Sequence, residues 1–179
     1  MTHILSTSEG EVAIRIATPG DAEALFNLRL EALVAHPEAF AADIEITRAR
    51  GVKAWEDAIT SDARDESGVI VIASAGNDLV GMTGVGRGHW PKTRHSGIVW
   101  GVYVTSAWRR LRIADAILGK CILWAGGHGI VVLKLGVVTT NEPAIRCYQR
   151  CGFVTYGTEP KSNYLGGEYF DEFLMARLT

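Results

Sequence analysis

Three arginines follow an apolar run near the middle of the chain. Residues 98–104 read IVWGVYV, and Arg109, Arg110 and Arg112 come shortly after them. From about Trp108 onward apolar residues return at helical spacing, so we expect a strand, a short turn and a helix. The first N–H groups of such a helix lack partners and, together with the helix dipole, favour an anion. Three cations at this point oppose the dipole unless a polyanion lies among them, so the pattern predicts a polyanion site.

A second segment, 141–153, is predicted to form another helix. Asn141 can cap it, Pro143 is tolerated in its first turn, and Gly152 ends it. Side chains of Ala144, Tyr148 and Cys151 then fall on one side of this helix.

The remaining patterns predict the elements that position these two segments. Thr18-Pro19-Gly20-Asp21 reads as a helix start, and this helix should stop before Pro37 because the residue ahead of a proline avoids the helical region. Residues 1–10 are expected to be frayed, and the polar run 61–68 to be a surface connection. The other expected helices are 48–59, 108–125 and 141–151, and the expected strands are 12–16, 69–75, 79–85, 98–104, 131–138, 153–157 and 168–178. This order predicts an α/β fold, with a sheet flanked by about four helices, in one domain spanning 1–179.

Composition narrows the class of protein. With 179 residues, 47% hydrophobic and 21% charged, the chain matches an ordinary globular domain with room for a core. The net charge of −2 argues against a general nucleic-acid binder. No apolar run reaches the roughly 18–20 residues of a membrane span, and the N-terminus lacks a signal-peptide pattern. We therefore expect a cytoplasmic protein that binds neither nucleic acid nor membranes.

Two features that resemble binding motifs have simpler interpretations. The three cysteines are too few for a disulfide scaffold, and Cys147 and Cys151 have no further metal ligand near them in the sequence, so buried thiols and no metal are expected. Gly84, Gly86 and Gly88 are not followed by a helix, as a nucleotide-binding loop would require. A twisted or bulged strand end is predicted there instead.

The two helical segments resemble the GNAT N-acetyltransferase superfamily. Residues 104–118 are similar to its strand, turn, Arg/Gln-x-x-Gly-x-Gly/Ala motif and helix, and residues 141–153 resemble its Asn-x-x-Ala-x-x-x-Tyr-x-x-x-Gly-Phe segment. The opening (IRIATPGDAEALFNLRLEAL, then HPEAF) and the ending (GGEYFDEFLMARL) are similar to bacterial members, so the resemblance covers nearly the whole chain. It implies a mixed, mostly antiparallel sheet with a V-shaped splay between the strands at 101–104 and 131–138.

The resemblance also implies acetyl-CoA as co-substrate. Backbone groups of the first strand would hold the pantetheine arm, the arginine loop the pyrophosphate, and the second segment would face the cofactor. The implied cofactor-binding residues are Val102, Tyr103, Val104, Arg109, Arg110, Leu111, Arg112, Ile113, Ala114, Asn141 and Tyr148.

The arginine loop departs from the family pattern. The family usually carries glycine where Arg110 and Arg112 stand, which lets phosphates approach the backbone without a β-carbon in the way. We expect helical geometry at both positions, which does not require glycine, and the guanidinium groups could add charge-assisted hydrogen bonds to a pyrophosphate. The alternative is that the loop has lost its ligand.

Acetyl transfer to an amine sets three chemical requirements. The amine must lose a proton, the oxyanion must be stabilised, for which a backbone N–H on the splayed strand is the candidate, and the departing thiolate needs a donor. Tyr148 occupies the position that the family uses for the general acid; the alternative is that it only packs the helix onto the sheet. Many members of the family use a carboxylate on the strand before the cofactor loop as the base, but strand 98–104 contains no acid. No base is therefore identified, and loss of the proton through water is an equal alternative to any carboxylate. Candidates for the acceptor site are Glu31, Asp43, Glu45, Phe40, Trp55 and Trp100.

These arguments predict an N-acetyltransferase for a primary amine of a small molecule, amino acid or peptide, with a homodimer possible because relatives are often dimers. The alternative is a non-catalytic acyl-CoA-binding module on the same fold, favoured by the loop arginines and the missing strand carboxylate. A phosphate-sugar or nucleotide binder of unrelated fold would require the match at 141–153 to be chance.

Overall fold

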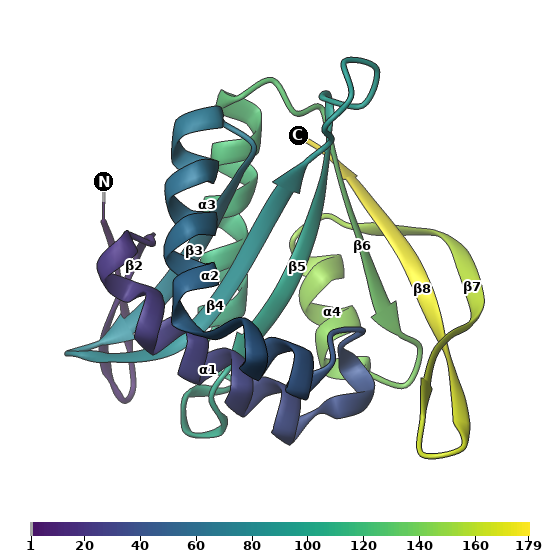
Figure 1. Cartoon of the computed structure of the whole chain (residues 1–179), viewed down its shortest axis with the longest axis horizontal. Helices are drawn as coiled ribbons and strands as arrows, with labels where there is room; N and C mark the ends of the chain where they lie inside the picture. The colour runs from purple at the N-terminus through teal and green to yellow at the C-terminus, as the bar shows by residue number, and fades with distance from the viewer. Residues whose placement is uncertain (1) are drawn as a thin grey trace.

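The computed structural model describes residues 2–179, which form one eight-stranded sheet with helices on both faces (Figure 1). The strands are β1 (His3–Thr7), β2 (Gly10–Ile16), β3 (Gly68–Ala75), β4 (Asp78–Arg87), β5 (Ser96–Val104), β6 (Val132–Val138), β7 (Val154–Leu165) and β8 (Glu168–Leu178). The helices are α1 (Ala22–Ala35), α2 (Ile44–Asp65), α3 (Ile113–Gly127) and α4 (Glu142–Arg150). Within these described residues, no helix combines the length and apolarity needed to cross a membrane.

The sheet is mixed and mostly antiparallel, as predicted. Its strand order is β1-β2-β3-β4-β5-β6-β8-β7, and β5 with β6 is the parallel pair. These two strands pair only from Ser96 opposite Val132 to Ile98 opposite Lys134, although both continue for several residues. Beyond that point they diverge, which confirms the V-shaped splay (Figure 1).

A bulge in β5 lies within the diverging part of the strand. Gly84 pairs with Trp100 and Met82 with Tyr103, so Gly101 and the next residue together oppose one residue of β4. Gly101 has φ 65°, a left-handed conformation that glycine adopts without a steric penalty. Such a bulge bends its strand, here near the end of β5.

The two faces of the sheet form two cores. Along β3, Val69 and Val71 pack on one face with α3 and α4, whereas Ile70 and Ile72 pack on the other with α1 and α2. This alternation is the period-two pattern of a strand that is covered on both sides. Because one pair of helices covers each face, α3 and α4 reach the splay from one side and α1 from the other.

The glycine-rich segment at 84–88 belongs to the sheet. Gly84 and Gly86 lie in β4, and no helix follows, so the prediction of a strand end is confirmed. A β-carbon at Gly84 would come within 2.3 Å of the Trp100 indole. The absence of a side chain at Gly84 therefore leaves the space that the Trp100 indole occupies.

Predictions at both ends of the chain were wrong. Residues 3–7 are not frayed, because they form β1 and pair antiparallel with β2. Near the other end, the connection between the expected strands 153–157 and 168–178 is mostly strand and not a loop, since β7 extends to Leu165 and the turn is confined to Gly166 and Gly167. Most of β7 is exposed at the sheet edge, so its polar residues concealed the strand pattern.

Two helix starts were also misplaced. Helix α2 runs from Ile44 to Asp65 rather than from 48 to 59, so most of the polar run at 61–68 is helical. It is kinked at Gly51, whose φ of 65° is not helical. Helix α3 begins at Ile113, not near Trp108, because Ser106–Trp108 forms a 3₁₀ turn that an irregular loop follows.

The entry to α1 gives a pH-dependent contribution to stability. Asp21 accepts hydrogen bonds from Arg15 at 2.6 and 2.7 Å and from the Thr18 backbone at 2.7 Å. The Arg15 hydrogen bonds, aided by Thr18, lower the pKa of Asp21 to about 2. A depressed carboxyl pKa stabilises the fold above the unfolded pKa of about 4, and this stabilisation is lost as the pH falls toward 2.

We therefore expect Asp21→Asn to lower the free energy of unfolding at neutral pH, and the gap from wild type to narrow as the pH falls below about 4. Urea unfolding of both proteins across the acid range measures this. A gap that stays constant down to about pH 2.5 would exclude the carboxylate as its cause.

Candidate active site

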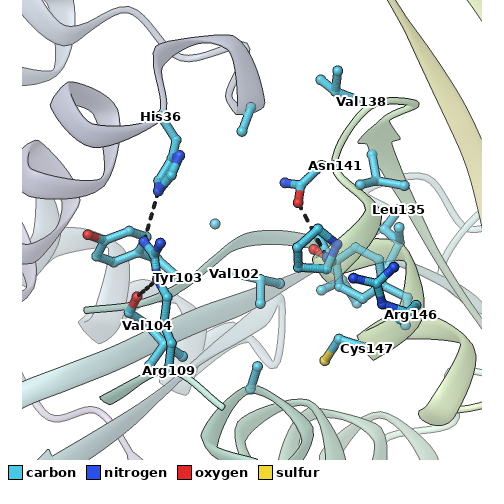
Figure 2. A pocket seen from close by; sticks show the side chains of 18 of the residues that line it. His36, Val102, Tyr103, Val104, Arg109, Leu135, Val138, Asn141, Arg146 and Cys147 are labelled. Carbon is cyan, nitrogen blue, oxygen red and sulfur yellow. Dashed lines mark hydrogen bonds between the residues drawn. The ribbon is translucent and has the colours of Figure 1, made fainter. Parts of the chain in front are cut away.

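A cavity of about 790 Å³ occupies the splay between β5 and β6. Its walls are the end of β5, the loop before α3, β6 and the start of α4, and the connection after α1 closes one end. Figure 2 places His36 and Arg109 on one side, Asn141 and Cys147 on the other, and Val102 between them.

The arginine loop has a backbone that differs from our expectation. Arg110 has φ 67° and Arg112 has φ 62°, so both adopt the left-handed conformation. The prediction that these positions are helical and do not require glycine was wrong. The loop backbone thus has the left-handed conformation that glycine favours, but arginines occupy both positions. Each non-glycine residue in this conformation costs roughly 1–2 kcal/mol.

This path leaves the start of α3 open for an anion. Arg112 is the N-cap and provides no capping side chain to the helix. The first amide to donate back is that of Ala116, to the Arg112 carbonyl at 3.1 Å. The N–H groups of residues 113–115 therefore have no acceptor within the helix, and Ile113 and Ala114 line the cavity. Free amides, the dipole and the loop arginines together form a site suited to a diphosphate.

An acid in the first turn of α3 is neutralised by arginines. Asp115 accepts from Arg150 at 2.9 and 3.0 Å and from Arg112 at 3.2 Å. Burial raises the pKa of Asp115, but these hydrogen bonds outweigh it and hold the pKa below its ordinary value. Asp115 therefore stays ionised and paired, so its charge opposes an anion at the helix start less than a free carboxylate would.

The end of β5 is tied to the connection after α1 by Arg109. Its Nε donates to the Val104 carbonyl at 3.1 Å and its Nη2 lies 2.8 Å from His36 Nε2 (Figure 2). Because arginine can only donate, His36 Nε2 must accept and carries no proton in this arrangement. Arg109 thus ties the loop to the end of β5 and to the connection after α1.

Tyr148 lies on α4 and lines the cavity. Its side chain is buried, and its ring packs edge-on against Phe153 with the centroids 6.2 Å apart. Within residues 2–179 the hydroxyl makes no hydrogen bond, so it is available to a ligand. Burial, followed by the nearby Cys147, Cys151 and Glu172, raises the pKa of Tyr148, so the hydroxyl keeps its proton as a donor.

Most of the predicted cofactor-binding residues line this one cavity. The exception is Leu111, which packs against the core instead. Asn141 caps α4 as predicted, accepting from the Ala144 amide at 3.3 Å. The predicted residues that line the cavity are Val102, Tyr103, Val104, Arg109, Arg110, Arg112, Ile113, Ala114, Asn141 and Tyr148.

The end of the cavity near α1 carries two aromatic side chains beside the polar His36 and Glu38. Phe40 and Trp100 line it, as expected for acceptor-site candidates. Glu31, also expected in the acceptor site, is exposed and does not line the cavity; it accepts a hydrogen bond from the Tyr103 hydroxyl at 2.8 Å. Burial, and then this bond, raise the pKa of Tyr103 above its ordinary value.

The other carboxylates considered as bases do not line the cavity. Asp43 caps α2 by accepting from the Ile46 amide at 2.8 Å, and Glu45 pairs with Arg48 in solvent. Two cavity residues that sequence reasoning missed are His36 and Glu38. They are brought there by the turn that Pro37 begins, and neither has a spacing that could have identified it.

A third potential metal ligand lies near Cys147 and Cys151 in the folded structure, although none lies near them in the sequence. Asp115 of α3 approaches Cys147 and Cys151, with one ligand atom from each within 4.8 Å of the others. Both oxygens of Asp115 are, however, bonded to Arg150, and Cys147 Sγ donates to Asp115 at 3.5 Å. Cationic neighbours and an occupied carboxylate make this a poor donor set for a cation.

Comparisons with known proteins agree with this arrangement. Residues 25–153 match the acetyltransferase (GNAT) family. The L-amino acid N-acetyltransferase AaaT of Escherichia coli is 27% identical over 170 residues, which cover 94% of this chain and 98% of that protein. Among solved structures, a GNAT-family acetyltransferase from Streptococcus pneumoniae has a TM-score of 0.84 at 24% identity, covering 93% of this chain and 98% of that one. A putative acetyltransferase from Salmonella typhimurium, solved with its cofactor acetyl-CoA, has a TM-score of 0.78 at 21% identity, covering 93% of each chain.

The splayed sheet and the open helix start thus define an acyl-CoA-type transferase fold. The chain belongs to the GNAT acetyltransferase family, because the family match covers well over half of it. It is an acetyl-CoA-dependent N-acetyltransferase.

The left-handed arginines allow strain and charge to be separated. We expect Arg112→Gly to match or exceed wild-type stability and Arg112→Ala to be about 1 kcal/mol less stable than Arg112→Gly, because only alanine keeps the β-carbon strain. Both lose the guanidinium, so both should raise the KM for acetyl-CoA by a similar factor, about 3–10-fold. Thermal unfolding and initial-rate kinetics of the pair measure this. Equal stability of the two variants would show that the backbone is not left-handed at this position.

Proposed function

We propose that the chain transfers the acetyl group of acetyl-CoA directly to a primary amine of a small molecule, amino acid or peptide. The proposal is carried by one observation: the open start of α3, the β5–β6 splay and the free Tyr148 hydroxyl all border the same cavity. A diphosphate at the arginine loop would let the pantetheine arm run along residues 102–104 into the splay. The thioester would then lie within reach of Tyr148.

In this mechanism the amine nitrogen attacks the thioester carbon and the carbon–sulfur bond breaks. A backbone N–H of the β5 bulge stabilises the oxyanion. Tyr148 acts as the acid by donating its hydroxyl to the departing sulfur. Because a phenol is ordinarily less acidic than a thiol, and burial raises the pKa of Tyr148 further, hydrogen bonding contributes more than complete proton transfer.

The base is assigned to water rather than to a side chain. His36 Nε2 is used by Arg109, and Glu31 is used by Tyr103. Glu38 also lines this end of the cavity, where its carboxylate lies 3.7 Å from His36 Nδ1. The proton of the amine is assigned to solvent in the cavity mouth, and none of these side chains is given the role of the base.

The acceptor is best supported as an amino acid. The Escherichia coli relative is described as an L-amino acid N-acetyltransferase, and it matches this chain over nearly its whole length. The aromatic lining at Phe40 and Trp100 suits an apolar side chain.

Thiol release from acetyl-CoA tests the function. Amino acids, polyamines, aminoglycosides and short peptides are each supplied with acetyl-CoA, and free thiol and acetylated product are measured. We expect equal amounts of both with at least one class. Acetyl-CoA binding without thiol release over the whole panel would favour the alternative, a non-catalytic acyl-CoA-binding module.

A further inference from the structure

Arg29 on α1 is a buried cation without a counter-charge. It is 8% exposed, and its Nη1 is buried with no partner. Within residues 2–179 its guanidinium forms no ion pair or hydrogen bond. Arginine remains protonated in proteins, so burying it unpaired is costly and needs an explanation.

The nearest acid on the same helix does not neutralise it. Glu31 directs an oxygen to the Tyr103 hydroxyl at 2.8 Å and forms no ion pair with Arg29. The guanidinium instead lies over the Phe40 ring, with its carbon 4.6 Å from the centroid. A cation–π contact satisfies one face of the group and leaves the N–H edge unpaired.

The unpaired N–H edge of Arg29 lies next to Gly101, a cavity-lining residue that has no side chain. A β-carbon built on Gly101 would be 3.5 Å from Arg29 Nη1. Gly101 and Phe40 both line the cavity. The unpaired N–H groups are thus adjacent to the acceptor end of the cavity, at the bulge in the diverging part of β5.

An unpaired guanidinium beside the cavity suits an acceptor that carries an anion close to its amine. In an α-amino acid, one carbon separates the amine from the carboxylate. A carboxylate held at Gly101 would leave its amine one carbon away, beside residues 102–104, which line the same cavity and along which the pantetheine arm is proposed to run. Phe40 belongs to the irregular connection between α1 and α2, so a shift of its ring can admit the carboxylate.

We propose that Arg29 binds the carboxylate of an α-amino acid acceptor at the Gly101 gap. The inference rests on the proposed acetyl transfer and specifies its acceptor class. A guanidinium and a carboxylate form paired, charge-assisted hydrogen bonds, and a site built for them rejects analogues that leave the buried group unpaired. Polyamines, aminosugars and the N-terminal amines of peptides lack an anion at this spacing.

The test compares L-amino acids with their carboxamides as acceptors for the full-length protein. L-leucine with L-leucinamide and L-phenylalanine with L-phenylalaninamide form matched pairs, and rates are compared at equal concentrations of neutral amine. We expect kcat/KM to favour the acids by at least about 30-fold. Acetylation of the amides as efficiently as the acids would overturn the role of Arg29 and leave acetyl transfer intact.

Variants of Arg29 attribute the preference to this residue. Arg29→Gln should raise the KM for the acids at least about tenfold, with the amides and acetyl-CoA changed less than about threefold, and Arg29→Lys should restore part of the loss. An equal effect on acids and amides would show that Arg29 only supports Phe40, and would overturn the proposal.

Product inhibition of the wild type provides a measurement that needs no variant, in case Arg29→Gln does not fold. N-acetyl-leucine should inhibit more strongly than N-acetyl-leucinamide, and equal inhibition would contradict carboxylate binding. Absence of thiol release with every acceptor, despite acetyl-CoA binding, would overturn the transfer function itself and this inference with it.

Discussion

Replacement of Tyr148 by phenylalanine is expected to lower kcat by about 10–100-fold with little change in the Kd for acetyl-CoA. Tyr148 lines the cavity, and its hydroxyl has no hydrogen-bond partner among the described residues, so the substitution removes no hydrogen bond within the protein. It removes only the donor proposed for the departing sulfur. For the same reason the melting temperature should stay close to that of wild type. Steady-state kinetics and isothermal titration with acetyl-CoA measure the two quantities separately.

Tyr156→Phe is the matched control for this substitution. Tyr156 lies on β7, is 59% exposed and does not line the cavity, so its variant should retain wild-type kcat. An unchanged kcat in Tyr148→Phe would reduce Tyr148 to a packing residue against Phe153.

Ala114→Asp is expected to weaken acetyl-CoA binding by at least about 100-fold while the protein stays folded. Ala114 lies in the first turn of α3 and lines the cavity. A carboxylate there would oppose a diphosphate a few ångströms away by about 3–4 kcal/mol, if an intermediate dielectric applies. An acid in a first turn is otherwise favourable to the helix, so stability should not fall for electrostatic reasons.

Ala107→Asp makes the same change of charge nearby. Ala107 is exposed in the preceding 3₁₀ turn and does not line the cavity, so it should alter the Kd less than about threefold. Titration calorimetry of both variants, with thermal unfolding as the folding control, makes the comparison. Wild-type affinity in Ala114→Asp would place the diphosphate elsewhere.

The parts of the fold that were predictable have strong local patterns. The continuous apolar run of β3 and the capped start of α4 at Asn141 identified these elements correctly. Exposed β7 at the sheet edge and the polar end of α2 carry no such pattern, so their extents depended on tertiary pairing that the sequence does not display.

The site shows the same division. The segments that line the cavity were predictable because two motifs bring them together. The left-handed path at Arg110 and Arg112 was not, since arginine gives no local signal for a positive φ. The unpaired state of Arg29 was equally hidden, because it depends on how Phe40 and Gly101 lie around the guanidinium and on no acid of residues 2–179 pairing with it.

The most direct measurement is the crystal structure of this chain with acetyl-CoA bound. We predict diphosphate oxygens within hydrogen-bond distance of the backbone N–H groups at 113–115, the pantetheine arm along residues 102–104, and the sulfur facing the Tyr148 hydroxyl. A cofactor bound outside the β5–β6 splay, or a splay closed by its own side chains at saturating acetyl-CoA, would contradict the account.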